Sequence, residues 1–380
     1  MPLLLTDEQK LLARTASEVI SKQSPVSRLR ALRNDKDELG YSPQLWKYMA
    51  ELGWTAIPFS EADGGLGMGM AEVVLVTEAL GRGLAPEPYI ACVMMGAQAL
   101  SLGGSTQQRT TWLPSIIDGS KMLALAYQEP GARYDLCKVD TRARRDGDGF
   151  VLEGDKHHVL GGFGADALVV SARTGDSTSQ NGGISLFLIP TDRAGVELGR
   201  QWRMDTNNAA IVGLRGVRAS ATDVVGKLDA GAQLLRNVVD RATVALCGEM
   251  LGGMNEALDR TLAYLQERTQ FGAIIGTFQA LKHRAARLYI QAELSRSAVM
   301  AAARALDADA PDAANLVCLA KARCSDAYVL IGQESVQLHG GIGMTDEHEI
   351  GFFLKRARAS EMTFGDAAFH RDRFATLSGF

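Results

Sequence analysis

The sequence lacks the cysteine spacings that would bind a metal or build a disulfide framework. Its five cysteines are odd in number, are scattered along the chain and share no C-x-x-C spacing. This pattern predicts neither disulfide bonds nor a zinc site, and it is typical of a chain in a reducing compartment. We therefore expect a cytoplasmic protein without a metal centre.

The sequence also lacks a long hydrophobic run and an excess of charge of one sign. The most apolar run, residues 90–100, is too short to span a bilayer and is interrupted by Gly96 and Gln98. The first nine residues contain acidic side chains and no basic segment, so no signal peptide is predicted. The 40 Lys and Arg residues are nearly balanced by 44 Asp and Glu residues. Neither a nucleic acid nor a membrane is therefore an expected partner.

The chain does contain enough apolar material for a large core. Its 380 residues, 46% of them hydrophobic, predict two or three domains. Residues 1–120 have a helical apolar period, which begins after a capping box at Thr6–Gln9. Three glycines alternate along residues 65–69, but no βαβ pattern surrounds them, so we interpret this segment as a loop rather than a dinucleotide motif.

The apolar period changes near Lys121 and again near Gly231. Between them, short β-forming runs separated by Gly, Asp and Asn predict a compact antiparallel β domain over residues 121–226. The Arg-rich residues 142–145 next to Asp-Gly-Asp-Gly indicate a polar hairpin turn, and residues 173–183 a mobile hairpin tip. Three long amphipathic segments and a shorter one predict a four-helix bundle over residues 227–380. The expected fold class is thus α+β.

A polar corner between two of the predicted helices stands out as a candidate nucleotide site. Arg268 can pair bidentately with a phosphate, Phe271 has a flat apolar face, and Gly272 and Gly276 allow a close approach of the backbone. An alternative interpretation is that Arg268 is a solvated helix end and Phe271 packs into the core.

Two ordered motifs include this corner. The spacing E-R-x-Q-F-G, I-G-x-F-Q and L-K-H occupies residues 267–283, and Q-L-H-G-G-I-G occupies residues 337–343. Together they resemble the FAD-binding C-terminal domain of the acyl-CoA dehydrogenase family, and the helical, β, helical order extends the resemblance over the whole chain. The resemblance implies a tetramer in which FAD lies across a contact between subunits.

The resemblance also implies which residues hold the cofactor. Arg268 would bind the pyrophosphate of a neighbour's FAD, and Gln270, Phe271, Gln279, Gln337, Gly340 and Gly341 would lie around it. Gln128 and His158 would lie on the flavin side of the chain's own subunit. We interpret His339, inside the second motif, as a packed core histidine rather than a base or a ligand.

The flavin side departs from the family pattern. Where the family has T-E-P-G-A-G-S-D, this chain has Q-E-P-G-A-R-Y-D at residues 128–135, so that a hydroxyl is replaced by Gln128 and a serine by Tyr134. The family's W-I-T stretch corresponds to H-V-L at residues 158–160, which keeps a ring and loses the threonine hydroxyl.

The positions of the catalytic base differ even more from the family pattern. Removal of an α proton from an acyl thioester requires a positioned carboxylate. The two positions from which family members take it correspond to Phe364 and Ala242, and neither is acidic. Asp366 is the nearest carboxylate to the first position. Asp240 and Glu249 flank the second, but a helix turns Asp240 about 200° away from the direction of Ala242 and places Glu249 about two turns further along.

These departures suggest a subunit that works with a sister chain. The sequence as a whole resembles the pimeloyl-CoA dehydrogenase small subunit group and other two-gene dehydrogenases. In such enzymes a sister subunit would supply the flavin contacts, the base and the acyl-CoA pocket. One alternative is a self-sufficient homotetramer with Asp366 as base, and another is a non-catalytic scaffold of the same fold. An electron-transfer flavoprotein is the acceptor that the resemblance implies.

Overall fold

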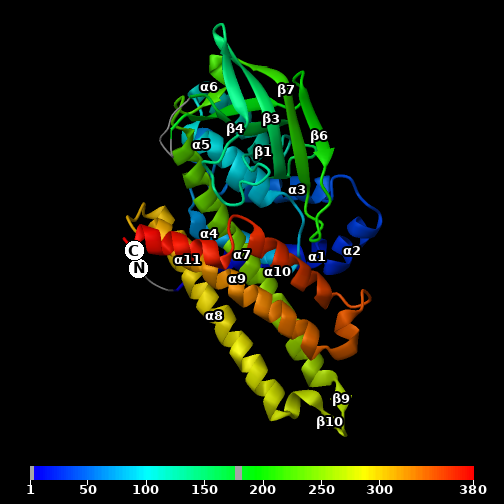
Figure 1. The fold of residues 1–380 in the computed structure, drawn as a ribbon. Helices are drawn as coiled ribbons and strands as arrows, with labels where there is room; N and C mark the ends of the chain where they lie inside the picture. Colours follow the sequence, from blue (N-terminus) through cyan, green and yellow to red (C-terminus); the bar gives the residue numbers. More distant parts are fainter. Residues whose placement is uncertain (1–3, 176–181) are drawn as a thin grey trace. The chain divides into compact units, whose positions relative to one another are not determined.

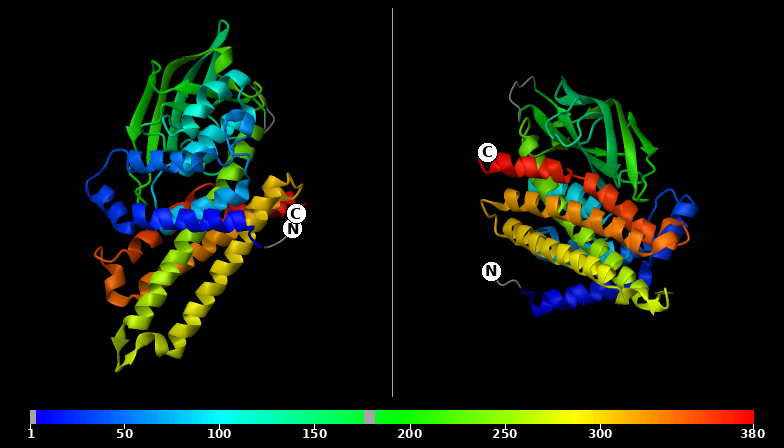
Figure 2. Two further views of the ribbon diagram at one scale, coloured as in Figure 1. Left: turned by 180° about the vertical axis from the view of Figure 1, so that it is seen from behind. Right: turned by 60° about the horizontal axis from the view of Figure 1, so that its bottom comes forward.

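The computed structural model describes residues 4–175 and 182–380, which form two compact units. One unit comprises the chain up to Ala31 together with Gly69–Ala85 and Thr243–Phe380; the other comprises Leu32–Met68 and Pro86–Ala242. Figures 1 and 2 show the ribbon from three directions. Residues 176–181 of the predicted hairpin tip lie outside the described residues.

The N-terminal residues are helical, as the sequence predicts. Thr6 and Gln9 form the expected capping box at the start of the first helix. Ser42 caps another helix, and Gly53 follows it with a φ of 78°. The helices are α1 (Asp7–Gln23), α2 (Val26–Asn34), α3 (Pro43–Glu51), α4 (Met70–Arg82), η3 (Ile90–Ala97), α5 (Gln98–Gly103) and α6 (Thr106–Ile117).

A sheet of eight strands forms the centre of the second unit. The strands are β1 (Leu123–Ala126), β2 (Arg142–Asp146), β3 (Gly149–Leu160), β4 (Ala167–Arg173), β5 (Ile184–Pro190), β6 (Val196–Arg200), β7 (Ala209–Ala219) and β8 (Val224–Val225). Their order is β6-β7-β3-β2-β4-β5-β8, with β1 paired to β4. The strands in which the largest fraction of residues is buried, β1, β4 and β5, lie next to one another in the sheet.

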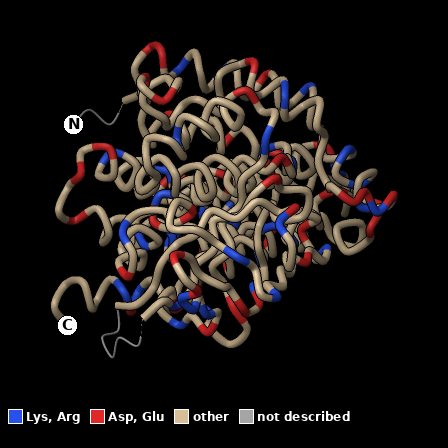
Figure 3. The backbone as a smooth tube through the Cα atoms, turned by 90° about the horizontal axis from the view of Figure 1, so that it is seen from above, with Lys and Arg blue, Asp and Glu red and all other residues tan. Residues whose placement is uncertain are grey.

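One expectation about this sheet is wrong. It is mixed rather than antiparallel, because β1 pairs with β4 in parallel and β2 makes a parallel bridge to β4. The expected polar hairpin turn is confirmed: Arg142, Arg144 and Arg145 lie on β2, and the turn after Asp146 joins β2 to the antiparallel β3. Figure 3 shows basic and acidic residues interspersed along the backbone.

The C-terminal part, which the structure describes completely, contains five α-helices rather than four. They are α7 (Gly231–Glu267), α8 (Gln279–Asp307), α9 (Ala313–Leu338), α10 (Ile350–Met362) and α11 (Ala367–Leu377). Helix α9 contacts α8, α10 and α11 (Figure 1). The additional helix, α11, was missed because it is short and few of its residues are buried.

No helix within residues 4–175 and 182–380 has both the length and the apolar content needed to cross a bilayer. None of the five cysteines, all of which lie in the described residues, forms a disulfide bond in the structure.

Candidate functional site

The polar corner is a two-strand hairpin between α7 and α8. Strand β9 (Thr269–Gln270) pairs with β10 (Ala273–Ile274), and the turn consists of Phe271 and Gly272. Both turn residues have positive φ, 53° and 74°. Two successive left-handed residues give the tight turn that joins antiparallel strands, and this turn directs the Phe271 ring outward.

The corner is exposed. Phe271 is 93% exposed, so the alternative in which it packs into the core is wrong. Arg268 is also exposed, and among residues 4–175 and 182–380 its guanidinium has no ion-pair or hydrogen-bond partner. A cation without a partner beside an exposed ring can bind a phosphate without first breaking an internal ion pair.

The second motif forms a glycine turn at the end of α9. Gly340 has a φ of 64° and begins the short helix η6 (Gly340–Met344). A Cβ added at Gly340 or Gly341 would meet nothing within 4 Å, so the backbone there is open on that side. Gln337 and Gln279 are exposed as well.

These residues fit the pyrophosphate and adenosine part of FAD. They include one unpaired guanidinium, amides that can both donate and accept, and glycine backbone that a ligand can approach. Arg268, Gln270, Phe271, Gln279, Gln337, Gly340 and Gly341 all lie in the unit that contains the C-terminal helices, and all are exposed. When bound, FAD supplies the hydride acceptor for a dehydrogenation.

His339 lies behind the glycine turn and is 2% exposed, which confirms the prediction of a core histidine. Its Nδ1 donates to the Ser335 carbonyl at 2.7 Å. The ring packs between Tyr264 and His348, with centroid distances of 4.5 Å to each. The histidine therefore joins the glycine turn to α7.

The loop of residues 128–135 belongs to the other unit and is anchored by a buried ion pair. The Glu129 carboxylate accepts from Lys156 Nζ at 2.5 Å and from the amides of Asp140 and Thr141 at 2.5 and 3.0 Å. Lys156 also donates to Ser171 Oγ. These bonds hold the pKa of Glu129 below its usual value, whereas burial lowers the pKa of Lys156 to about 8.

Gln128 and His158 lie on two segments that are joined directly. The amide of His157 donates to the Gln128 carbonyl at 2.9 Å. The pairing of β3 with β7 shifts register between Lys156 and Val159, and His158 has a φ of 53° within this bulge. Bulges commonly re-aim a side chain, and His158 is exposed as a result. Partial desolvation of the ring and the nearby Arg203 and His157 lower the pKa of His158 below its ordinary value, which favours the neutral imidazole.

The two positions expected for a base carry buried apolar side chains. Phe364 is 6% exposed and Ala242 is fully buried. Phe364 has a φ of 62°, and the turn around it is tightly held. Lys321 Nζ donates to the Gly365 carbonyl at 2.7 Å, and His370 Nε2 donates to the Phe364 carbonyl at 3.0 Å.

The neighbouring carboxylates are engaged elsewhere. Asp366 is the N-cap of α11 and accepts from the Phe369 amide at 2.9 Å. Glu249 pairs with the buried Arg356 at 2.6 Å. Asp240 is 7% exposed, so it is a buried residue of α7 rather than a surface one. A carboxylate that caps a helix or neutralises a buried guanidinium is not free to remove a substrate proton.

Sequence reasoning missed the two buried lysines, Lys156 and Lys321. Lys156 follows the inward alternation of Phe150 and Leu152 along β3, so the period of two contained a signal for its burial. Lys321 lies in an apolar stretch of α9, and no spacing in the sequence links it to the carbonyl of Gly365.

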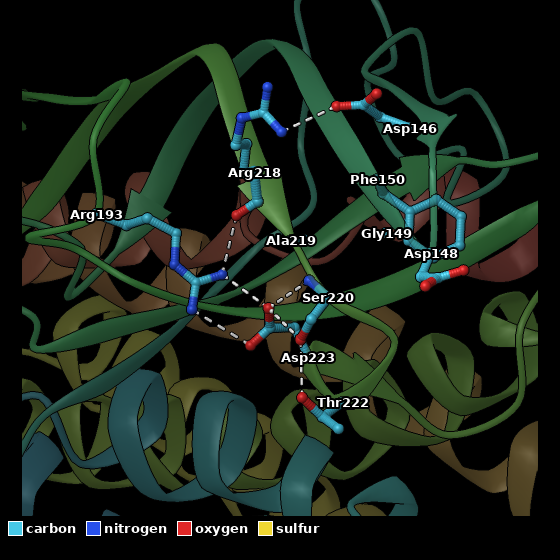
Figure 4. A pocket seen from close by; sticks show the side chains of 10 residues that line it. All are labelled: Asp146, Asp148, Gly149, Phe150, Arg193, Arg218, Ala219, Ser220, Thr222 and Asp223. Atoms are coloured by element: carbon cyan, nitrogen blue, oxygen red, sulfur yellow. Dashed lines mark hydrogen bonds and ion pairs between the residues drawn. The ribbon is translucent and has the colours of Figure 1, made fainter.

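A separate hollow of about 660 Å³ lies beside the β2–β3 turn (Figure 4). Its two arginines are already paired, Arg193 with Asp223 at 2.8 Å and Arg218 with Asp146 at 3.0 Å. Because these pairs neutralise its cations, the hollow lacks the free positive charge that a nucleotide requires.

Comparison with known proteins identifies the family. The models of the acyl-CoA dehydrogenase N-terminal, middle and C-terminal domains match residues 6–120, 124–215 and 229–377. Probable acyl-CoA dehydrogenase YngJ of Bacillus subtilis is 28% identical over 97% of both chains. Acyl-CoA dehydrogenase IpdE2 of Mycolicibacterium smegmatis is 29% identical over 95% of this chain and 96% of its own.

Solved structures are similar over the full length. A variant of the Tcur3481-Tcur3483 steroid ACAD is 31% identical, with a TM-score of 0.87 over 98% of both chains. The ChsE4-ChsE5 complex from Mycobacterium tuberculosis is 27% identical, with a TM-score of 0.90 over 100% of both chains. The chain therefore belongs to the acyl-CoA dehydrogenase family of FAD-dependent oxidoreductases, which dehydrogenate acyl-CoA thioesters.

Proposed function

We propose that this chain is one subunit of a heteromeric acyl-CoA dehydrogenase. It contributes the nucleotide grip, which we define as the Arg268 corner together with the Gly340–Gly341 turn. This surface binds FAD that a sister chain holds, and the sister chain contributes the catalytic base. The observation that carries the proposal is that both base positions hold buried apolar side chains, Phe364 and Ala242. The assembly is a tetramer, as the family resemblance implies.

The absence of a carboxylate at these positions has a large expected effect. A positioned general base contributes roughly 10²- to 10⁴-fold to a rate. Asp366 and Glu249 are the acidic residues considered as alternative bases, and both have other partners in the structure. A self-sufficient enzyme would have to break the α11 cap or the Arg356 ion pair to recruit one of them.

The exposed grip supports the other half of the proposal. Arg268, Phe271 and Gln337 are open to solvent, so they are available to a ligand that another chain holds. A flavin held entirely within one chain would instead be expected to bury its contacts.

The names of the relatives point to the same arrangement. One similar structure is the ChsE4-ChsE5 complex, and another is a variant of the Tcur3481-Tcur3483 steroid ACAD. On this basis we assign an acyl-CoA as the substrate and an electron-transfer flavoprotein as the acceptor. We place the complex in the cytoplasm, the location that the cysteine pattern predicts.

Purification of the chain alone and together with a sister chain tests the proposal. We expect a colourless lone chain and a yellow co-expressed complex that reduces a dye with an acyl-CoA. A yellow and active lone chain would support the self-sufficient homotetramer instead. A colourless preparation in both cases would support a scaffold without flavin.

Two substitutions in the co-expressed complex refine this test. Arg268→Ala should release FAD, because it removes the unpaired cation of the corner, whereas Arg14→Ala on α1 is a matched exposed control that should retain FAD.

Asp366→Asn should leave turnover nearly unchanged. Loss of turnover in Asp366→Asn with flavin still bound would identify Asp366 as the base and refute the assignment of the base to the sister chain.

A further inference from the structure

Three rings connect the two segments that form the nucleotide grip. Tyr264, on α7 just before the Arg268 corner, stacks on His339 with a centroid distance of 4.5 Å and an interplanar angle of 29°. His339, inside the glycine turn, packs against His348 with a centroid distance of 4.5 Å and an angle of 51°. The ring stack therefore joins the corner, the turn and the start of α10.

We propose that His339 and His348 are positioning residues that hold the Arg268 corner and the Gly340–Gly341 turn in register on FAD, and that protonation of His348 releases this grip. The inference rests on the proposed function, since it assigns acid control to the same nucleotide site. Neither histidine touches the ligand; both act through the segments that they connect.

The hydrogen bonding of His348 explains the sensitivity to acid. Its Nδ1 accepts from the Ile350 amide, the first residue of α10, at 3.1 Å. An accepting nitrogen carries no proton, so the ring is neutral in this arrangement. A second proton would go onto Nδ1, where it would face the amide hydrogen and break the bond.

His339 is constrained in the same way. Its Nδ1 donates to the Ser335 carbonyl, so a second proton would go onto Nε2 of a ring that is 2% exposed. Burial lowers the pKa of both histidines. Two imidazolium rings at this spacing would also repel each other.

The charged groups around the stack oppose protonation further. Arg260 on α7 faces both histidines, and Arg30 on α2 faces His348. The Glu349 carboxylate favours the charged form of His348, but it already pairs with Arg260 at 2.7 Å. Arg30 is likewise engaged, with the carbonyls of Asp346 and Glu347 and with the Asp346 carboxylate at 3.3 Å. Tyr264 contacts the stack through its ring.

The test measures FAD retention by the co-expressed complex at about pH 8 and about pH 5.5, on the two sides of the ordinary histidine pKa. In the wild type, the dissociation constant for FAD should rise roughly fivefold at the lower pH if binding lowers the pKa of one histidine by about one unit, because each unit of difference can change the constant by at most about tenfold. His348→Phe keeps a ring in the stack and removes the titration. Its dissociation constant should stay within roughly threefold across this range.

Matched variants separate positioning from folding. His348→Ala removes the ring and should weaken FAD binding at both pH values, while Tyr264→Phe keeps the ring and should behave as the wild type. Hydrogen exchange of the apo complex gives a readout without flavin. Residues 264–271 and 337–349 should both lose protection at low pH in the wild type, and neither should in His348→Phe.

The outcomes distinguish this inference from the proposed function. Bound FAD with the same acid response in the wild type and in His348→Phe would overturn the inference alone. A complex that binds no FAD at any pH would overturn the proposed function and the inference with it. Loss of protection across the whole chain at low pH would show general acid unfolding and would also refute the specific role of the stack.

Discussion

At the scale of single residues, the structure shows that Asp366 is the N-cap of α11. Its carboxylate accepts from the Phe369 amide and so satisfies one of the free backbone donors at the start of α11. Chain order alone made Asp366 a candidate base, because it lies two residues beyond Phe364. The capping bond shows a structural reason for an acidic residue at this position.

We expect Asp366→Ala to lower the free energy of unfolding by about 1 kcal/mol, the usual cost of losing an N-cap. Asp366→Asn should lie within about 0.5 kcal/mol of the wild type, because asparagine caps helices equally well. Urea denaturation measures both values. Equal stability of the Ala variant and the wild type would show that the cap contributes nothing.

His370 makes the stability of the chain dependent on pH. Burial, reinforced by Lys321, lowers the pKa of His370 to about 3. Between about pH 3 and 6.5 the unfolded chain therefore binds a proton that the folded chain does not, and stability falls as the pH falls through this window. From pH 7 to about pH 4 the loss from this histidine should be on the order of 3 kcal/mol.

His370→Gln keeps a donor for the Phe364 carbonyl and removes the titration. Its stability should consequently depend less on pH over the same range, as measured by denaturation at several pH values. An unchanged slope would contradict the assignment of this acid sensitivity to His370.

At the scale of elements, glycines set how closely α4 and α7 approach each other. A Cβ on Gly81 would lie 1.9 Å from the Glu249 carbonyl oxygen, and one on Gly252 would lie 1.9 Å from the Glu78 carbonyl oxygen. The two backbones can touch only because neither position has a side chain. This crossing also places Glu249 near Leu84, since Arg356 bonds to both.

We expect Gly81→Ala to destabilise the protein by about 3 kcal/mol or more, because the backbone of α7 would have to move. Gly351→Ala is the matched control: it lies in α10 with nothing within 4 Å of the added Cβ, and it should stabilise the protein by up to about 1 kcal/mol. Thermal unfolding compares the two variants. A similar melting temperature for both would refute the close contact.

At the scale of the whole molecule, α8 has an apolar surface that nothing in the described part of the chain covers. Tyr289, Ile290 and Leu294 are 57%, 52% and 52% exposed, and Ile290 and Leu294 share one helix face. Clusters of exposed apolar side chains commonly mark contacts between proteins. This surface is on the same helix as Gln279, and we propose that the sister chain of the proposed heteromer binds to it.

Ile290→Glu should therefore abolish co-purification of the two chains, because it introduces a charge into an apolar contact. Leu11→Glu, on α1, replaces a leucine that is 53% exposed and should leave the complex intact. Size-exclusion chromatography of co-expressed proteins measures the outcome. If Ile290→Glu leaves the complex whole, the contact between subunits does not involve this face of α8.

Local patterns in the sequence determined much of the architecture. The Thr6–Gln9 capping box, the apolar period of the long helices and the motifs at residues 267–283 and 337–343 all depend on neighbours along the chain. They were therefore readable without a fold. The absence of an acidic residue at positions 364 and 242 was equally plain from the sequence.

Only the tertiary structure decided how these residues are used. Parallel pairing of β1 with β4, the bond from Lys321 to Gly365 and the stacking of His339 on Tyr264 join segments that are far apart in sequence. Such contacts depend on how elements pack, and hydrophobic periodicity predicts the type of each element but not which elements contact each other. The exposure of Phe271 was undecided for the same reason, since a ring beside a glycine can point into a core or away from it until the φ angles of the turn are known.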